Sequence, residues 1–226
     1  MGKLELPSLA LKASHFSLAQ DPFLQMSLST NASLQDFQQV YDDPFFSTEL
    51  AETPQLAGTE KQRLERARVQ YFDLGSSSAI ADLVPLVLLS PLLDLAGFYG
   101  APFSFSARDS ILLPGSDEET PSGKINMLVI QEQLWIATVE SQWATVTPQT
   151  ALPLVLETMM DRALDDGARF ALITNGMESL FVRLIGAETP QYALSETYSL
   201  SGLGFELYEI LRLLKAIARI VSASEF

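Results

Sequence analysis

Residues 125–143, with the sequence INMLVIQEQLWIATVESQW, constrain the fold of this chain more than any other stretch. Apolar residues dominate two short runs within and beside it, 124–131 and 134–142, which indicates two β-strands. Only Gln131–Gln133 separates the two runs, and a connection this short joins strands that pair antiparallel. The stretch therefore predicts a β-hairpin with extensive apolar packing.

Polar residues share one face of this predicted hairpin. Side chains alternate between the two faces of a strand, so Glu140 and Gln142 lie on the same face, and Asn126 can face the same way from the first strand. The opposite face is predicted to be buried and holds Trp135, Ala137 and Val139 on the second strand, with Ile125, Met127 and Val129 on the first. Asn126, Glu140 and Gln142 are our candidate site; the alternative is that they are ordinary solvent-facing residues of an unrelated fold.

The rest of the chain alternates between helical and strand patterns. Helical patterns occur at 33–50, where a turn at Asp42-Asp43-Pro44 follows a short helix, and at 59–72, 79–98, 148–162 and 205–222. Strand patterns occur at 102–106, 109–113, 169–174, 178–185 and 192–200. Asn175-Gly176 marks a turn, the spacing of Thr59 and Gln62 predicts a capping box, and the last strand is expected at a sheet edge. This order favours an α/β fold with a mixed central sheet flanked by helices, a helical N-terminal extension and a long C-terminal helix.

The length and net charge of the chain limit the number of domains and the kinds of partner that we expect. The 226 residues fit one domain, which we place at 34–226, after an N-terminal arm at 1–33. The 28 acidic residues outnumber the 14 lysines and arginines, which gives a net charge of −14. Proteins that grip DNA gain affinity from cations that displace counterions from phosphates, so DNA is disfavoured as a partner. A basic protein surface would be attracted.

The N-terminal arm has no clear hydrophobic period. It is either flexible or a strap that binds a partner, in which case its apolar side chains are the candidate contacts: Phe16, Phe23, Leu24 and Met26. His15 is the only histidine, so neither a metal site nor histidine catalysis is expected there.

We expect a cytoplasmic protein without a transmembrane segment. The chain has no cysteine, which excludes disulfides and is compatible with a reducing compartment. The most apolar stretch, Leu83–Leu93, is much shorter than the roughly 20 residues that span a bilayer, and two prolines interrupt it. The first residues lack the features of a signal peptide.

Several blocks of the sequence resemble one enzyme superfamily, in the same order along the chain. GKINMLVI, LWIATVESQ, a helix with Gln149 in its first turn, and RFALITNG are similar to the PD-(D/E)XK nucleases, above all to the N-terminal nuclease domain of type I restriction enzyme R subunits. YDDPFF, EKQRLERAR, SPLLDLAGFYGAPF and ELYEILRLLKAI resemble small stand-alone proteins of photosynthetic bacteria labelled restriction endonuclease subunit R. The resemblance runs from Ser33 to Val221 and implies a restriction-endonuclease-like core.

The motif of that superfamily reads Gly-Arg/Lys-Ile-Asp and then Glu-x-Lys. Its Asp and Glu hold Mg²⁺, because a hard divalent cation prefers anionic oxygens, and its Lys orients or activates the attacking water. In this chain Asn126 stands at the Asp position, Glu140 is retained, and Gln142 stands at the Lys position. Asp94 matches the acidic residue of the preceding helix, unless it is simply an exposed helix residue.

The resemblance thus implies a nuclease scaffold with a degenerate active site. Loss of one preorganised electrostatic contact typically slows hydrolysis by about 10²–10³-fold. Our first hypothesis is a non-enzymatic interaction or structural protein, an accessory subunit of a larger complex that needs no cofactor. The alternative is an active Mg²⁺-dependent DNA endonuclease, with Asn126 and Glu140 as metal ligands and Glu132 or Glu157 replacing lost groups. DNA binding without cleavage is a third hypothesis.

Two helices carry clusters of cations. The clusters are Lys61, Arg63, Arg66 and Arg68 in the helix at 59–72, and Arg212, Lys215 and Arg219 in the last helix. Such clusters are typical of solvated helix faces with ion pairs along the helix. The alternatives are DNA contacts and a docking surface for an acidic protein.

Overall fold

The computed structural model describes residues 34–41, 43–74, 84–113, 122–140, 146–161, 167–186, 188–200 and 205–223. Its helices are η2 (Leu34–Asp36), α2 (Phe45–Glu52), α3 (Gly58–Asp73), η3 (Pro85–Leu89), α5 (Ser90–Ala96), α6 (Pro148–Met160) and α7 (Phe205–Ala223). Its strands are β1 (Gln38–Gln39), β2 (Phe105–Leu113), β3 (Gly123–Ile130), β4 (Leu134–Glu140), β5 (Arg169–Thr174), β6 (Glu178–Ile185) and β7 (Gln191–Ser199). The N-terminal arm and nearly all of the acidic loop at 115–123 lie outside the described residues.

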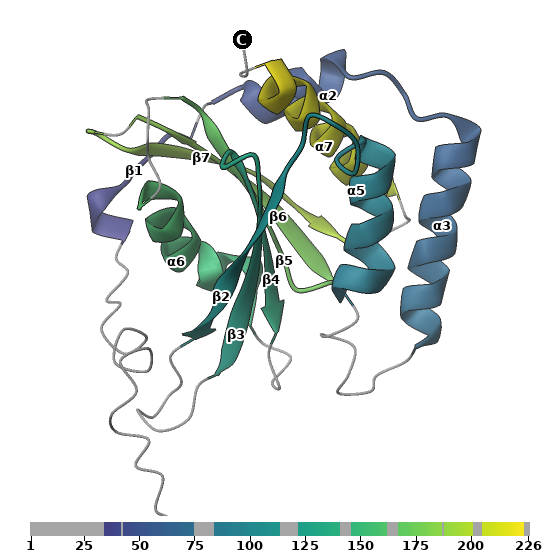
Figure 1. Cartoon of the computed structure of the whole chain (residues 1–226), viewed down its shortest axis with the longest axis horizontal. Coiled ribbons are helices and arrows are strands. Elements are labelled where there is room, and N and C mark those ends of the chain that lie inside the picture. Colours follow the sequence, from purple (N-terminus) through teal and green to yellow (C-terminus); the bar gives the residue numbers. More distant parts are fainter. Residues whose placement is uncertain are drawn as a thin grey trace, which may run out of the picture. The chain divides into compact units, whose positions relative to one another are not determined.

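The strands form one mixed sheet in the order β1-β7-β6-β5-β4-β3-β2 (Figure 1). β2, β3 and β4 are an antiparallel meander, whereas β4 and β5 are parallel and α6 connects them. A parallel pair needs such a crossover because its strands cannot be joined by a tight turn. Every residue of β4 and β5 is buried, which explains why these inner strands read as nearly continuous apolar runs.

Helices cover both faces of the sheet (Figure 1). α6 packs on one face over a core that includes Ile125, Trp135 and Ile173. α2, α3, α5 and α7 lie on the other face, over a core that includes Ile136 and Phe181. The chain is therefore α/β with helical layers on either side of a mixed sheet, as the pattern predicted. Among the described residues, no helix has the length and apolar character that crossing a membrane requires.

Most predicted elements are confirmed. The hairpin is present as β3 and β4, with Ile130 paired to Leu134 across the short connection. The helix at Pro148, the strands flanking Asn175-Gly176 and the C-terminal helix occur within a few residues of their predicted bounds. Gly97 ends α5 with a positive φ of 90°, a conformation that favours glycine. The described part of the predicted helix at 79–98 begins at Val84.

Several local predictions are wrong. In 33–50 the α-helix follows the Asp-Pro turn instead of preceding it: α2 begins at Phe45, and the residues before the turn form the short η2 and β1. The strands expected at 102–106 and 109–113 are a single strand, β2, with a register shift between Arg108 and Ile111. β7 is not at the edge, because the two-residue β1 pairs with it in parallel. Two glutamines carry no strand pattern, so β1 escapes detection in the sequence.

The start and one face of α3 also differ from expectation. The helix begins at Gly58, and Glu60 accepts a hydrogen bond from the Ala57 backbone N–H at 2.8 Å, so Thr59 lies inside the first turn and forms no capping box. Phe72, predicted in the apolar stripe, is 42% exposed, whereas Tyr71 beside it is buried.

Candidate functional site

The pairing of β3 with β4 brings two of the predicted site residues together. The register sets Lys124 opposite Glu140 and Asn126 opposite Thr138, so Asn126 is diagonal to Glu140. Diagonal neighbours on one face of a sheet are within reach of long side chains. Glu140 lies an even number of residues from Ile136 on β4, so both point to the face of the sheet that α3, α5 and α7 cover. Asn126 points to the same face, because it pairs with Thr138 of β4.

Glu140 keeps its carboxylate in a nearly buried position, with an exposed fraction of 8%. Its Oε2 lies 2.8 Å from Lys124 Nζ. Its Oε1 accepts a hydrogen bond from Asn126 Nδ2. A buried charge is tolerated only where it is paired and hydrogen-bonded, and Glu140 has both kinds of partner.

Asn126 joins Glu140 to the neighbouring strand β2. Its amide oxygen accepts a hydrogen bond from Ser110 Oγ at 2.5 Å, while its amide nitrogen faces the carboxylate. A carboxylate only accepts hydrogen bonds, so the amide must turn its donor end to Glu140. An Asp at this position would place two carboxylates together, and only a proton or a cation would relieve their repulsion. The asparagine replaces that need with a direct hydrogen bond.

Other predicted residues lie outside the described part of the chain. Gln142 falls in 141–145, so its place relative to Glu140 stays a prediction. The same holds for the candidate partner contacts of the N-terminal arm: Phe16, Phe23, Leu24 and Met26.

The structure does not join Asp94 to Glu140. Asp94 lies near the end of α5, and its Oδ2 is 2.5 Å from Arg63 Nη2 on α3. Val84, at the start of the same helical stretch, lies against Gly176 in the β5–β6 turn. The ten residue steps from Val84 to Asp94 correspond to about 15 Å of helix, which leads away from this end of the sheet.

The two acidic residues considered as replacements lie elsewhere. Glu132 is in the hairpin turn, about 26 Å along an extended strand from Glu140, and pairs with Arg108 at 2.9 Å. Glu157 lies on α6, which covers the opposite face of the sheet. Burial raises the pKa of the Glu157 carboxyl, and the charge of Asp161 adds to this effect. Neither residue supplies a second carboxylate beside Glu140.

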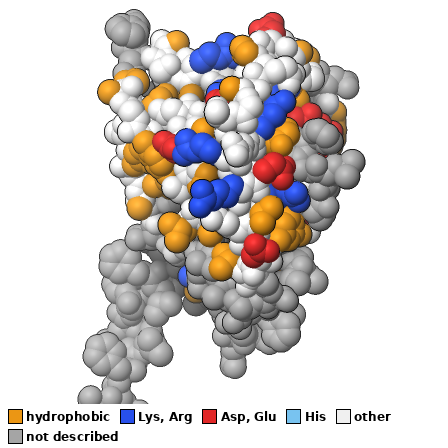
Figure 2. Space-filling view, turned by 90° about the vertical axis from the view of Figure 1, so that its right-hand side faces the viewer, with side chains coloured by type: hydrophobic (Ala, Val, Ile, Leu, Met, Phe, Trp, Pro, Cys, Tyr) orange, Lys and Arg blue, Asp and Glu red, His pale blue; other side chains and the backbone are white. Residues whose placement is uncertain are grey.

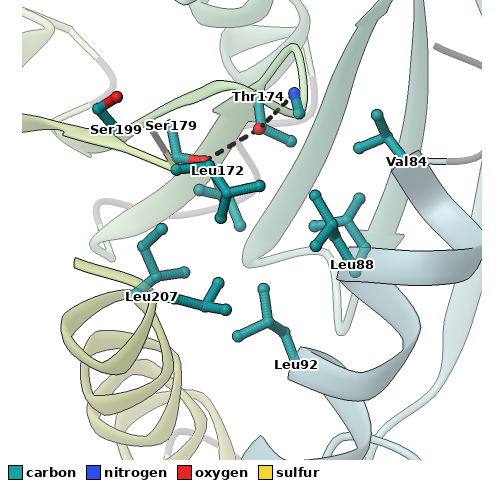
Figure 3. Close-up of a pocket in the computed structure, with 12 residues that line it drawn as sticks. Val84, Leu88, Leu92, Leu172, Thr174, Ser179, Ser199 and Leu207 are labelled. Carbon is teal, nitrogen blue, oxygen red and sulfur yellow. Dashed lines mark hydrogen bonds between the residues drawn. The ribbon is translucent and has the colours of Figure 1, made fainter. Parts of the chain in front are cut away.

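A cavity of about 20 Å³ lies on the face of the sheet to which Glu140 points, against β5 and β6 (Figure 3). At its polar end Thr174 Oγ1 accepts hydrogen bonds from Ser179 Oγ at 2.9 Å and from the Gly176 backbone N–H at 3.0 Å, and donates one to the Glu178 carbonyl. Leucines of η3, α5 and α7 line the rest. This volume has room for about one water molecule, so it is no substrate pocket.

Metal binding at this site would rest on Glu140 and Asn126. In the part of the chain that the structure describes, no group of three or more His, Asp or Glu side chains gathers as ligands of a metal ion would. Glu140 is already neutralised by Lys124, and Asn126 offers a neutral oxygen that Ser110 occupies. The observed arrangement is a closed polar network across three strands.

Sequence reasoning missed Lys124 and Ser110 as members of this network. The pairing of Lys124 with Glu140 was predictable from the hairpin, because both residues are equally far along the chain from Glu132, the centre of the connection. Ser110 could not be found this way, because its place on β2 depends on the register shift of that strand.

Most of the clustered cations tie elements of the domain together. In α3, Arg63 pairs with Asp94 of α5 and Lys61 lies over the ring of Tyr208 of α7, whereas Arg68 pairs with Glu65 within the same helix. In α7, Arg212 donates to the Leu50 and Thr53 carbonyls, Lys215 pairs with Glu60, and Arg219 pairs with Glu49. Figure 2 shows the side of the molecule on which α3 lies, and there lysines and arginines are interspersed with acidic side chains. The described face is therefore not a uniform basic patch of the kind that binds nucleic acid.

Comparison with known proteins gives no further guide, since no protein-family model, no curated protein and no solved structure matches the chain.

Proposed function

We propose that this protein has a restriction-endonuclease-like core without nuclease activity, and that it acts by binding another protein, as an accessory subunit of a larger complex. One observation carries the proposal: each oxygen of the Glu140 carboxylate already has a partner, Lys124 on Oε2 and Asn126 on Oε1. Magnesium in a hydrolase needs anionic oxygens that are free to face the ion. To bind it, Glu140 would have to give up its ion pair with Lys124.

The sheet topology supports the core that we assign. The meander β2-β3-β4, the crossover helix α6 and the parallel strand β5 form a mixed sheet with helices on both faces. Asn126 lies on β3 and Glu140 on β4, two adjacent strands of this meander, which supports the proposal. This topology is compatible with the core that the resemblance implies.

One observation favours the alternative, a Mg²⁺-dependent DNA endonuclease. The ammonium of Lys124 lies 2.8 Å from Glu140, so the site contains a cation although the motif lysine is absent. An ammonium at this place could stabilise charge on a phosphate in the transition state. In the free protein, however, the ammonium neutralises the carboxylate that the metal would need.

A nicking assay separates the two functions. Purified protein is incubated with supercoiled plasmid and Mg²⁺ or Mn²⁺, beside the Glu140→Ala variant. We expect no cleavage above that of the variant. Cleavage by the wild type that Glu140→Ala abolishes would overturn the proposal.

A gain-of-function variant tests the stated cause. Asn126→Asp should create a divalent-cation site, because two adjacent carboxylates then need a cation, and Mg²⁺ titration by calorimetry should detect it. The matched control is Asn126→Asp in a Glu140→Gln background, which should bind no Mg²⁺. Equal Mg²⁺ binding by wild type and Asn126→Asp would show that the asparagine is not what closes the site.

Binding through the N-terminal arm is tested by co-purification from native cells. We expect a protein partner with the full chain and loss of that partner when Phe16, Phe23, Leu24 and Met26 are replaced by Ser. A control variant in which serines 27 and 29 of the arm become Ala should retain it. Unchanged co-purification by the first variant would exclude these four side chains as the contact.

A further inference from the structure

β2 is the last strand of the sheet. Among the residues that the structure describes, β3 is the only strand that pairs with it. The nine residues Phe105–Leu113 thus leave one long edge without a paired strand in the described chain, whereas β1 pairs with β7 at the other end of the sheet. Such an edge presents backbone N–H and C=O groups with which another strand can pair.

Hydrogen bonds near the two ends of β2 show which of its backbone groups point outward. The carbonyls of Ser104 and Leu113 accept bonds, at 3.1 and 3.0 Å, from backbone N–H groups that flank the two ends of β3. Both carbonyls therefore point toward β3. Because this direction alternates from one residue of a strand to the next, the backbone groups of Phe105 and Leu112 point away from β3.

Large apolar side chains are exposed at both ends of this edge. The exposed fractions are 40% for Phe105 and 39% for Leu112. The ring of Tyr99, itself 53% exposed, lies 5.7 Å from the Phe105 ring and extends the apolar surface. Exposed apolar side chains on a long edge strand are typical of a surface that another chain covers.

The register shift within β2 turns Phe105 and Leu112 to the same face of the sheet. In a regular strand, residues an odd number apart point to opposite faces, as these two would. Here they pair with Ile130 and Lys124 of β3, which are an even number apart and share one face. The extra residue of the bulge resets the alternation.

These features make the outer edge of β2 self-complementary. When two copies of one strand pair antiparallel, the two-fold axis is perpendicular to the sheet. Paired residues must then point to the same face, and where they exchange hydrogen bonds both must turn their backbone groups outward. Phe105 and Leu112 meet both conditions, so each can lie opposite the other across the axis.

We propose that two copies of this chain form a dimer through β2, with Phe105 of each copy opposite Leu112 of the other and the two sheets joined into one. Two-fold symmetry repeats this apolar pair, and the two ends of the strand carry it. This inference goes beyond the proposed function and does not depend on it.

The expected dimer is reversible. A cross-strand apolar pair contributes up to about fivefold to an equilibrium constant relative to alanines, and the dimer contains two such pairs besides the backbone hydrogen bonds. A contact along one strand is at the small end of protein interfaces. Two chains of net charge −14 repel each other, so the assays are run at high salt, which screens this repulsion.

Disulfide formation between two different variants tests the register, and the absence of natural cysteines leaves no competing thiol. Phe105→Cys is mixed with Leu112→Cys under oxidising conditions. The proposed register brings these two Cα atoms to about 5.5 Å, within reach of a disulfide. Identical positions of the two copies lie about 23 Å apart along the strands, so neither variant should cross-link alone.

We expect a covalent dimer in the mixture, formed at least about tenfold faster than in either variant alone, because pairing raises the effective concentration of the thiols. Non-reducing electrophoresis measures the rates. Ala107→Cys mixed with Leu112→Cys tests a register shifted by two residues and should react more slowly. Equal rates in the two mixtures, or no covalent dimer in the first, would overturn the proposal.

Sedimentation velocity over a range of protein concentrations tests the dimer itself. Phe105→Lys should weaken dimerisation by about tenfold, since symmetry removes both apolar pairs. The matched control is Tyr41→Lys, which changes an aromatic side chain that is 83% exposed beside β1, at the far end of the sheet, and should leave dimerisation unchanged.

Ala107→Pro tests the backbone pairing. Ala107 lies two residues after Phe105, so its N–H points away from β3, and proline there removes no bond within the sheet. We expect a monomer that keeps the wild-type circular dichroism spectrum. A monomeric wild type, a dimer that Phe105→Lys and Ala107→Pro leave intact, or assemblies larger than the closed pair would each contradict the proposal.

Discussion

Gly176 in the β5–β6 turn is the position where one added methyl group should be most damaging. A Cβ built there lies 2.4 Å from Tyr71 Oη and 2.5 Å from Val84 Cγ2, and φ of Gly176 is +88°. Tyr71 and Val84 are 3% and 2% exposed, so packing leaves neither side chain free to withdraw. We therefore expect Gly176→Ala to strain the backbone and to force α3 and η3 away from the sheet.

The expected cost has two parts. A left-handed conformation costs a residue other than glycine about 1–2 kcal/mol. Overpacking of a closed core by one methyl group adds about 1–3 kcal/mol. Gly176→Ala should thus lower the free energy of unfolding by about 2–5 kcal/mol, and for a chain of this length each kcal/mol lowers Tm by about 2–4 °C.

Two glycines of the same chain separate these parts. Gly97 also has a positive φ, of 90°, but a Cβ there meets no atom within 4 Å, so Gly97→Ala should show the backbone cost alone. Gly58 has open space and no positive φ, so Gly58→Ala should be neutral or slightly stabilising. The difference between Gly176→Ala and Gly97→Ala then measures the steric contact.

Guanidinium chloride unfolding followed by fluorescence and circular dichroism gives the three values, and equal slopes across the variants would show that the denatured states are comparable. In a double-mutant cycle, Tyr71→Phe should recover part of the loss in Gly176→Ala, because it removes the nearest atom. If Gly176→Ala cost no more than Gly97→Ala, the packing of α3 and η3 on this turn would be refuted.

Three further predictions concern charged side chains. Lys124→Met should destabilise the protein by about 1–2 kcal/mol in chemical unfolding, less than for a fully buried pair because the lysine is 45% exposed, and a further Glu140→Gln should recover most of that loss. Arg212→Met should cost about 2 kcal/mol in the same assay, since it leaves the Leu50 and Thr53 carbonyls at the C-terminal end of α2 without this donor. An unchanged midpoint would remove Arg212 from the contacts that hold α2. Burial raises the pKa of the Glu209 carboxyl, and the charge of Glu196 adds to this effect, so the ionised carboxylate destabilises the fold. Glu209→Gln should therefore raise Tm at pH 7–8, and this gain should vanish below pH 4.5, the ordinary pKa of the group. A gain in Tm that does not depend on pH would contradict this cause.

The sequence was sufficient to predict two residues of the candidate site. Alternation along two strands placed Asn126 and Glu140 on one face, and the structure joins them by a hydrogen bond. The pairing of Lys124 with Glu140 also follows from the length of the hairpin connection. The position of Asp94 could not be predicted, because its ion pair with Arg63 depends on how α3 packs against α5.

Most of the longer elements and the buried faces of β3, β4 and α7 were determined by the sequence alone, because periods of two and of 3.6 residues are properties of near neighbours along the chain. Partners for the charges were decided only by the tertiary structure. Lys215 pairs with Glu60, which is 155 residues away in the sequence, and Arg219 pairs with Glu49, which is 170 residues away. No local pattern encodes such a pairing, since it exists only once the sheet has fixed which helices lie side by side.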